Sequence, residues 1–330
     1  MRGGRAFGVL TVYLLLLSCL VVVIYGFTAR TIANPNPFDA GGPPPPLGKI
    51  LFYGVTLVEL LLIAPLAPSF TAGAIAGERE RQTFDLVMTT PIRGRDFVLG
   101  KLASGISYVL LLIFVALPVQ VLALLFGGLT LTELLLGFWT LIVATVFYAS
   151  VSLFFSSVMK TTTTASLFSY IVVAMSLIGA LFVALISSII GIGGPLGIFF
   201  EGPPDQAAPK TWAVYLALLL VSLSPLTAGG LTAVALNTGE GTFWFRLGEG
   251  EGIPGHPNGY FIVSPWLVYS VIYLGLSALV IFLSMRYVRP TTARNPNNPS
   301  RPPVLREEGL PPPPPPRRVD LPPSAAQEGT

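Results

Sequence analysis

One stretch of the chain, Gly77–Lys101, carries nine charged residues among its 25, in a sequence that is otherwise poor in charge. We call it the polar segment. It begins Glu78-Arg79-Glu80-Arg81, and the alternating signs leave this part neutral. A neutral but charged stretch suits a complementary protein surface better than an anionic membrane. The chemistry that these residues predict is therefore docking of another protein, with ion pairs fixing the register.

On a single α-helix, the start of the polar segment would present one mostly apolar face. Positions i, i+4, i+7, i+8, i+11 and i+12 of that face are Ala76, Glu80, Thr83, Phe84, Val87 and Met88. Pro91 should end the helix. We expect it to lie flat at the cytoplasmic interface, either as an anchor among lipid headgroups or as a docking element with adaptable apolar contacts from Leu86 and Met88.

Glu59 is a second candidate, because it lies ten residues into a long apolar run. An unpaired charge at that depth in a membrane costs several kcal/mol. Its carboxyl group must therefore be paired, protonated or turned to a wet cavity. One interpretation is a hydrogen bond between helices, with Ser18, Tyr108 or Thr145 as candidate partners. The other is a place on a substrate path.

The composition shows which elements must position these residues. Only 11% of residues are charged and 52% are hydrophobic, whereas ordinary globular proteins carry about 25% charged residues. This balance excludes a soluble enzyme. The single cysteine, Cys19, excludes an intrachain disulfide, and with the single histidine, His256, it leaves no ligand set for a Cys or His metal site. We expect no catalytic residues, bound metal or cofactor on this chain.

Six runs are long and apolar enough for membrane-spanning helices, which need about 20 residues each. They are Phe7–Phe27, Ile50–Ala76, Leu102–Phe126, Leu134–Met159, Ala165–Ile190 and Phe261–Met285. The predicted fold is an all-α polytopic membrane protein. The polar segment then forms an interfacial helix between the second and third spans, and the run Thr161–Thr164 forms a turn with capping capacity.

A seventh run, Trp212–Leu236, is interrupted by Ser224-Pro225 and Gly229-Gly230. Its unbroken first part would reach only about 20 Å as a helix, which is too short for a span. Six spans with both termini in the cytoplasm place most Lys and Arg residues inside, whereas seven would distribute them almost evenly. We therefore expect a broken re-entrant hairpin before the sixth span, with a seventh span as the alternative.

The chain changes character after the last span. Residues 290–330 contain many prolines, including Pro311 through Pro316, and few large apolar side chains. Such a composition cannot offset the entropy of ordering. The predicted organisation is a transmembrane domain over 1–289 and a disordered proline-rich cytoplasmic tail over 290–330.

The polar segment resembles the corresponding part of the permease subunits of ABC-2-type transporters. In that family, an acidic and arginine cluster precedes Thr, an acidic residue, aliphatic positions, a proline and a closing Gly-Lys. The matching residues here are Glu78, Arg79, Glu80, Thr83, Asp85, Leu86, Val87, Pro91, Asp96, Phe97, Gly100 and Lys101. The six spans and the broken hairpin are also similar to the family. Asp85 stands where glutamate is frequent, and the proline-rich loop and tail are not typical.

The resemblance implies an exporter permease whose coupling helix fits a cleft in a separate cytoplasmic ABC ATPase. The coupling residues would be Glu78, Arg79, Glu80, Arg81, Thr83, Phe84, Asp85, Leu86, Met88 and Pro91. No Gly-x-x-x-x-Gly-Lys-Ser/Thr loop occurs in the sequence, so ATP and magnesium would bind to the partner ATPase.

Two permeases, as a homodimer or a heterodimer, would enclose the path in the plasma membrane, among membrane lipids and with no nucleic acid partner. The alternative is an ATP-independent membrane protein, either a secondary transporter or a structural assembly factor. The substrate is not predicted.

Overall fold

The computed structural model describes most of the apolar runs and parts of the segments between them. The described residues are 3–33, 47–84, 93–191, 200–201, 208–209, 215–216, 219, 222–237, 242–247 and 260–288. The tail from residue 289 onward lies outside them, as does the loop that contains His256, so the predicted tail disorder and domain boundary stay predictions.

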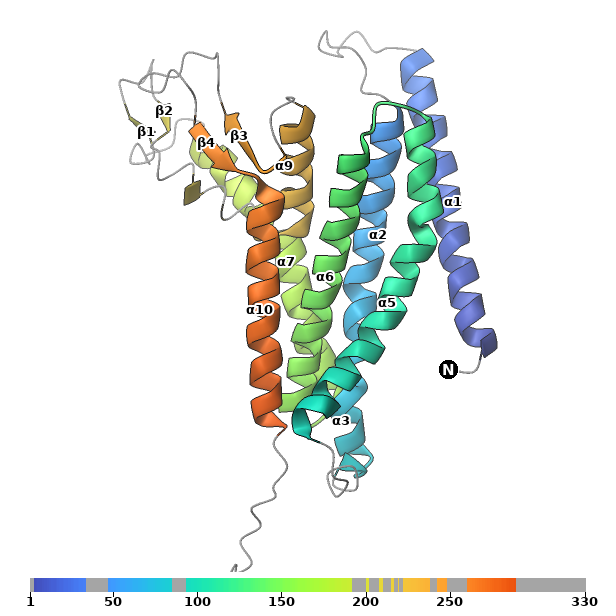
Figure 1. The fold of residues 1–330 in the computed structure, drawn as a ribbon, viewed down its shortest axis with the longest axis vertical. Helices are drawn as coiled ribbons and strands as arrows, with labels where there is room; N and C mark the ends of the chain where they lie inside the picture. Colours follow the sequence, from blue (N-terminus) through green and yellow to red (C-terminus); the bar gives the residue numbers. More distant parts are fainter. Residues whose placement is uncertain are drawn as a thin grey trace, which may run out of the picture. The chain divides into compact units, whose positions relative to one another are not determined.

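Within the described ranges, six helices are long and apolar enough to cross a membrane, which confirms the predicted all-α class and span count. They are α1 (Gly3–Ala33), α2 (Leu47–Thr71), α5 (Gly94–Leu125), α6 (Leu131–Val158), α7 (Thr162–Gly191) and α10 (Pro265–Tyr287). Two shorter helices, α3 (Gly73–Glu80) and α9 (Pro225–Asn237), lie at opposite ends of the bundle (Figure 1). We call these the α3 end and the α9 end.

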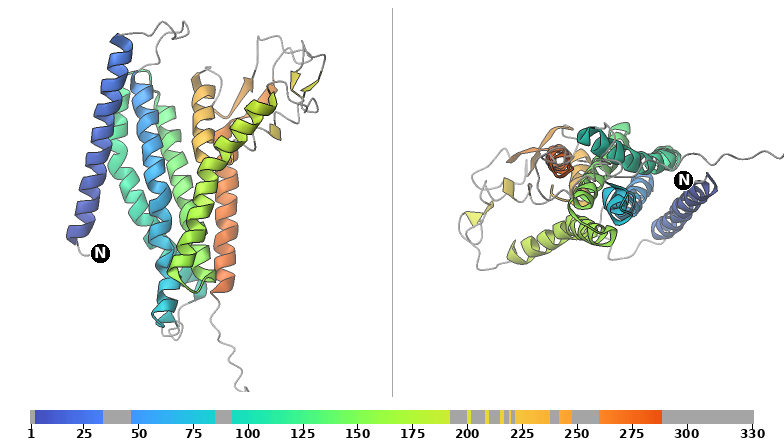
Figure 2. Two further views of the ribbon diagram at one scale, coloured as in Figure 1. Left: turned by 180° about the vertical axis from the view of Figure 1, so that it is seen from behind. Right: turned by 90° about the horizontal axis from the view of Figure 1, so that it is seen from below.

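Helix α6 lies at the centre of the bundle, with α2, α5, α7 and α10 packed against it (Figure 2). It is 61% buried over its most apolar window, whereas α1 is only 11% buried. Small and hydroxylated residues on α6 let its neighbours approach closely. The buried hydroxyls of Thr140, Thr145 and Ser150 donate to carbonyls four residues earlier, so they need no partner on another helix.

The main core lies where α6 meets α10, and three large tyrosines fill it. Tyr148, Tyr269 and Tyr273 are almost fully buried. Their hydroxyls are all bonded: Tyr148 to Ser176 Oγ (2.7 Å), Tyr269 to the Thr140 carbonyl (3.3 Å) and Tyr273 to the Leu223 carbonyl (2.8 Å). Because a buried polar group is costly without a partner, these bonds make the aromatic core tolerable in the membrane.

Short strands accompany the helices at the α9 end, which the sequence did not indicate. β1 (Phe200–Glu201) pairs with β2 (Ala208–Pro209), and β3 (Trp244–Leu247) pairs with β4 (Tyr260–Val263), both antiparallel. They lie outside the six long helices, so the all-α class of the membrane region holds.

Helix α9 begins at Pro225, inside the interrupted run Trp212–Leu236, and its 13 residues would span only about 20 Å. A proline suits the first position of a helix, where its missing N–H is not needed. Much of the first half of the run lies outside the described residues. A short helix after the break agrees with the predicted hairpin, but the re-entrant path itself stays a prediction.

Candidate coupling site at the α3 end

Helix α3 is almost a continuation of α2. Pro68 lies inside α2, and only Ala72 separates the end of α2 from the start of α3. The N–H of Ala72 still bonds to the Pro68 carbonyl at 2.8 Å. The same carbonyl accepts a hydrogen bond from Ser152 Oγ of α6 at 3.2 Å. The junction between α2 and α3 is thus attached to the central helix rather than free to swing.

The first turn of α3 is capped by a different helix. Its own N-cap residue, Ala72, has no side chain that can accept a hydrogen bond. Instead, the hydroxyl oxygen of Ser156 on α6 accepts from the N–H groups of Ile75 (3.0 Å) and Ala76 (2.9 Å). Ile75 and Ala76 are fully buried. Because the first amides of a helix have no intrahelical acceptor, Ser156 satisfies groups that would otherwise be buried and unbonded.

The charged residues of α3 bind three different neighbours in the chain. Glu78 forms an ion pair with Lys101 of α5, with 2.5 Å between Oε1 and Nζ. Arg79 donates to the Met159 carbonyl at the end of α6 at 3.3 Å. These contacts attach α3 to the start of α5 and the end of α6.

Glu80 caps helix α7. Its carboxylate accepts from the Thr162 N–H at 2.9 Å and from the Thr162 hydroxyl at 2.8 Å. A negative charge at a helix N-terminus is favoured by the exposed N–H groups and the helix dipole. The side chains of Thr161 and Thr164 also bond to each other there, which agrees with the predicted capping capacity. The predicted turn over Thr161–Thr164 is wrong for its last three residues, because α7 already begins at Thr162.

The continuous amphipathic helix predicted from Ala76 to Met88 is helical only as far as Glu80 and is interrupted there. Helix α3 ends at Glu80, and Gln82 has a positive φ of 57°. The N–H of Thr83 bonds to the Glu78 carbonyl and that of Gln82 to the Arg79 carbonyl, both at 3.0 Å. This is a Schellman C-cap with glutamine in the place that glycine usually takes. The turn moves Thr83 and Phe84 out of the predicted helical register.

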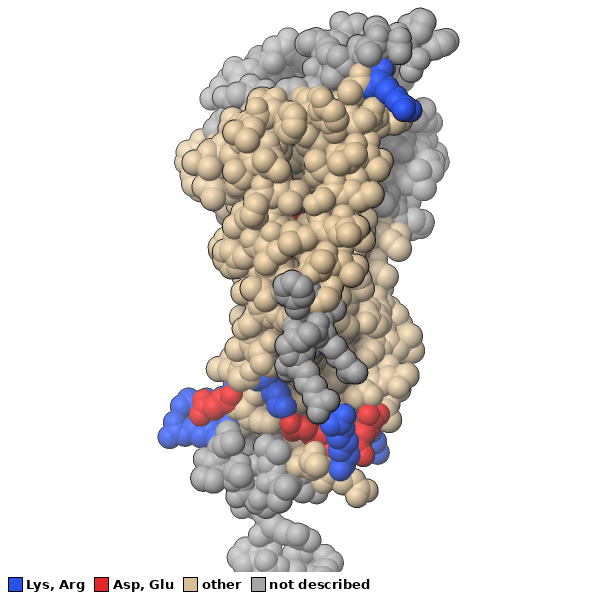
Figure 3. All heavy atoms as spheres, turned by 90° about the vertical axis from the view of Figure 1, so that its right-hand side faces the viewer, with Lys and Arg blue, Asp and Glu red and all other residues tan. Residues whose placement is uncertain are grey.

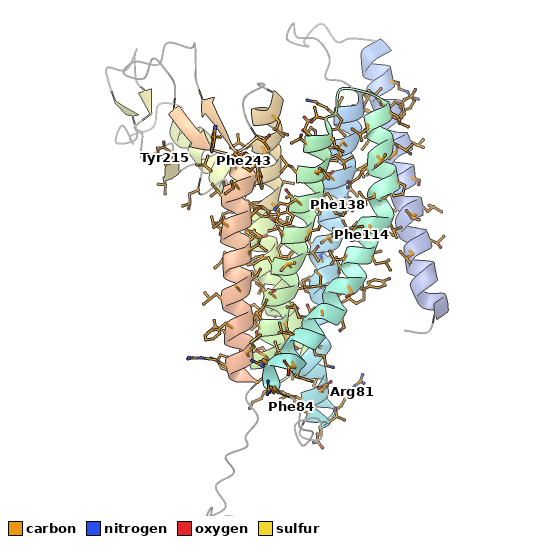
Figure 4. The ribbon with its side chains drawn as sticks, viewed as in Figure 1. Arg81, Phe84, Phe114, Phe138, Tyr215 and Phe243 are labelled. Carbon is orange, nitrogen blue, oxygen red and sulfur yellow. The ribbon has the colours of Figure 1, made fainter. Side chains whose placement is uncertain are left out.

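The remaining coupling candidates divide by exposure. Arg81 and Thr83 are exposed, whereas Phe84 is half-buried between the Arg79 guanidinium and the Phe97 ring. Figure 4 shows Arg81 and Phe84 at this end of the bundle. Asp85, Leu86, Met88 and Pro91 lie outside the described residues.

Charged side chains gather at the same end of the molecule. On the face shown in Figure 3, most described Lys, Arg, Asp and Glu residues form a band around one end, and the surface between the two ends is almost free of charge. The first helix, α1, begins at Gly3 at this end of the bundle, and the last helix, α10, ends at Tyr287 at the same end (Figure 1). This is expected for an even number of long helices. The charge band and the α3 contacts therefore belong to one end.

Glu59 is fully buried in α2, and its partner is one that the sequence analysis did not name. Gln120 Nε2 of α5 donates to Glu59 Oε2. Of the predicted partners, Thr145 bonds instead to a carbonyl of its own helix. A glutamine in the third predicted span was the available signal, because an amide in a membrane helix also needs a partner.

Two further polar contacts were missed. Ser156 gives no signal in the sequence, because its role depends on a helix 80 residues away. At the α9 end, Glu133 bonds to Lys49 (2.9 Å) and completes a capping box with Thr130 at the start of α6. The Thr-x-x-Glu pattern at Thr130 could have revealed the capping box. In the described part of the chain, no three His, Cys, Asp or Glu side chains gather as a metal site would require.

A comparison with family models identifies the family of the chain. A family model described as "ABC-2 family transporter protein" matches residues 49–228, more than half of the chain. The chain belongs to the ABC-2 transporter family. A comparison with curated proteins finds no match. The matched region of this ABC-2 permease runs from the start of α2 into α9, so it contains the polar segment and every partner of α3 described above.

Family membership makes the chain a multi-pass membrane protein and the membrane permease of an ABC transporter. Permeases of this family are membrane transport components that associate in general with an ABC ATPase. The residues that contact such a partner are not indicated by the family match, so the coupling residues stay predictions.

Proposed function

We propose that this ABC-2 permease couples ATP hydrolysis by a separate cytoplasmic ATPase to the outward movement of a substrate. The observation that carries the proposal is the attachment of α3 to α5, α6 and α7 through Glu78, Arg79 and Glu80. An element bonded to three long helices transmits a push as a rigid-body displacement of all three. ATP and magnesium are held by the ATPase.

The contacts of α3 suggest a division of roles within the predicted coupling residues. Glu78, Arg79 and Glu80 hold α3 on the bundle, so they act as positioning residues. Arg81 and Thr83 are exposed beside them, so they are the described residues that would meet the ATPase. The other predicted coupling residues, Asp85, Leu86, Met88 and Pro91, lie outside the described residues. A rim charge such as Arg81 contributes mainly to partner choice and association rate.

The complete transporter in this proposal contains two permeases and two ATPase subunits in the plasma membrane. The α3 end and both chain termini face the cytoplasm, in agreement with the positive-inside distribution of basic residues. Large apolar side chains on α1, such as Val12, Leu15 and Val22, are more than 60% exposed. They are available to lipid or to the second permease.

Copurification with the ATPase tests the proposal. The wild-type permease, extracted in detergent, should co-elute with an ATPase and raise its hydrolysis rate. Arg81→Glu should weaken co-elution because it reverses an exposed charge on the docking surface. Arg30→Glu is the matched control, since Arg30 is an exposed arginine in the last turn of α1, at the end of the bundle opposite to α3. Absence of an ATPase from the wild-type preparation would favour the ATP-independent alternative and overturn the proposal.

A further inference from the structure

A cavity of about 510 Å³ lies between α2, α6 and α9, at the α9 end. Its walls are mostly apolar, with Phe52, Leu60, Leu136, Leu141 and Leu226 among them. Neither α3 nor any of the residues that hold α3 lines this cavity. Glu59 does not line it either, so the cavity is separate from both sites predicted from the sequence.

The cavity is elongated along the helices. On α2 its lining runs from Lys49 to Leu60, and on α9 from Pro225 to Leu236, which is twelve residues and eleven steps in each case. At 1.5 Å per residue this is a depth of about 16 Å. The hydrocarbon core of a bilayer is about 30 Å thick, so one leaflet is about 15 Å deep. The cavity therefore matches the depth of one leaflet.

Polar groups lie at the outer end of the cavity and are scarce along it. Lys49 and Glu133 form an ion pair of 2.9 Å there, and the Tyr53 hydroxyl donates to the same Glu133 oxygen at 3.3 Å. The Glu133 side chain is only 2% exposed and both of its oxygens accept hydrogen bonds within the chain, so it fixes the Lys49 ammonium, which is 17% exposed. An ammonium held in this place at the membrane interface can bond to the phosphate of a lipid headgroup.

Further in, the buried Thr56 hydroxyl has no partner among the described residues. The two other threonines in the lining, Thr140 and Thr232, donate to carbonyls of their own helices. These few hydroxyls are too sparse to hold water along the cavity.

We propose that this cavity binds one hydrocarbon chain of an amphipathic lipid, whose headgroup lies beside Lys49, Tyr53 and Glu133. An apolar space of this size, with polar groups only at its outer end, has the usual character of a site for a lipid-like ligand. The proposal does not depend on ATPase coupling, because none of its residues belongs to the α3 end.

Glycines on α9 allow the cavity to be filled without disturbing its walls. A Cβ atom at Gly229 would meet no atom within 4 Å, and Gly229 lines the cavity. A leucine there should occupy the space of the lipid chain. Gly275 on α10 is equally open but does not line the cavity, so Gly275→Leu is a matched control. Gly230→Leu provides a second filling variant if Gly229→Leu does not fold.

The test uses the full-length permease in nanodiscs that contain a phosphatidylcholine with a diazirine at the end of one chain. After irradiation, mass spectrometry should find lipid adducts on the lining residues of α2, α6 and α9. These adducts should be lost in Gly229→Leu and kept in Gly275→Leu. Adducts that persist on the lining in both filling variants would overturn the proposal. The proposal would also be overturned if adducts were no more frequent on the cavity lining than on exposed α1 residues such as Leu15 and Val22, because such labelling reports only the surrounding lipid.

Discussion

At the α3 end, a short helix is bonded through polar atoms to three neighbours, whereas at the α9 end a short helix leaves an apolar cavity between itself and two neighbours. Both short helices lie beside α6, the most buried helix. The polar contacts of α3 are directional and leave it little freedom. Apolar walls around a cavity are not directional, and their spacing can change. The difference is the basis of the two proposals, that the α3 end transmits displacement and that the α9 end accommodates a ligand.

The largest expected effect comes from removing the hydroxyl that caps α3. Ser156→Ala leaves the buried N–H groups of Ile75 and Ala76 without their acceptor. Each unsatisfied buried group costs about 1–3 kcal/mol, so we expect a loss of about 2–6 kcal/mol in the free energy of unfolding. Thermal unfolding in detergent, followed by tryptophan fluorescence, measures it.

Ser157→Ala is the control for this change. Ser157 is also buried, but its hydroxyl donates to the Phe154 carbonyl in its own helix. Removal of that hydroxyl should have a much smaller effect. Equal losses of stability in the two variants would show that Ser156 does not hold α3 through these amides.

A smaller loss is expected from breaking the capping box at the α9 end. Thr130→Ala removes the oxygen that accepts from the Glu133 N–H at 3.2 Å. Loss of an N-cap side chain costs about 1 kcal/mol in free energy of unfolding. ATPase stimulation should stay at the wild-type level, because α3 is not involved. A permease that unfolds at the lower temperature and also fails to stimulate the ATPase would show that the two ends are not independent.

Glu80→Ala should reduce stability less but should impair coupling. Glu80 is exposed, and a carboxylate near an exposed helix N-terminus contributes about 0.3–1 kcal/mol. The bond from α3 to α7 is nevertheless lost, so ATPase stimulation should fall while co-elution persists. Thr162→Ala removes one of the two bonds to the same carboxylate. The double variant should therefore lose less stability than the sum of the single variants, and exact additivity would argue against the contact.

The two ends also differ in how far the sequence could predict them. The six long helices follow from the lengths of apolar runs, and the capping box at Thr130 and Glu133 is a local pattern. The contacts of α3 are not local: Ser156 and Thr162 are ordinary hydroxyl residues about 80 positions away. The turn at Gln82, directly after the end of α3, was missed because glutamine rarely adopts a positive φ. Charge alternation singled out the polar segment but did not show that its first three charges bind within the chain.

Glu59 lies between the two ends, and its substitution should have the smallest effect. In Glu59→Gln, the new amide can still accept from Gln120 Nε2. Its own NH₂ group can donate to Gln120 Oε1, which has no partner among the described residues. Two amides can thus bond reciprocally without a buried charge, so stability and transport should stay close to wild type.

Glu59→Leu is the contrasting variant, because it leaves the buried Gln120 amide without a partner. It should lower the unfolding temperature, whereas Glu59→Gln should not. This pair separates the two interpretations of Glu59. A hydrogen bond that joins α2 to α5 predicts that only the leucine variant is impaired. A place on the substrate path predicts that Glu59→Gln loses transport while it unfolds at the wild-type temperature. The burial of Glu59 and its absence from the cavity lining favour the first outcome.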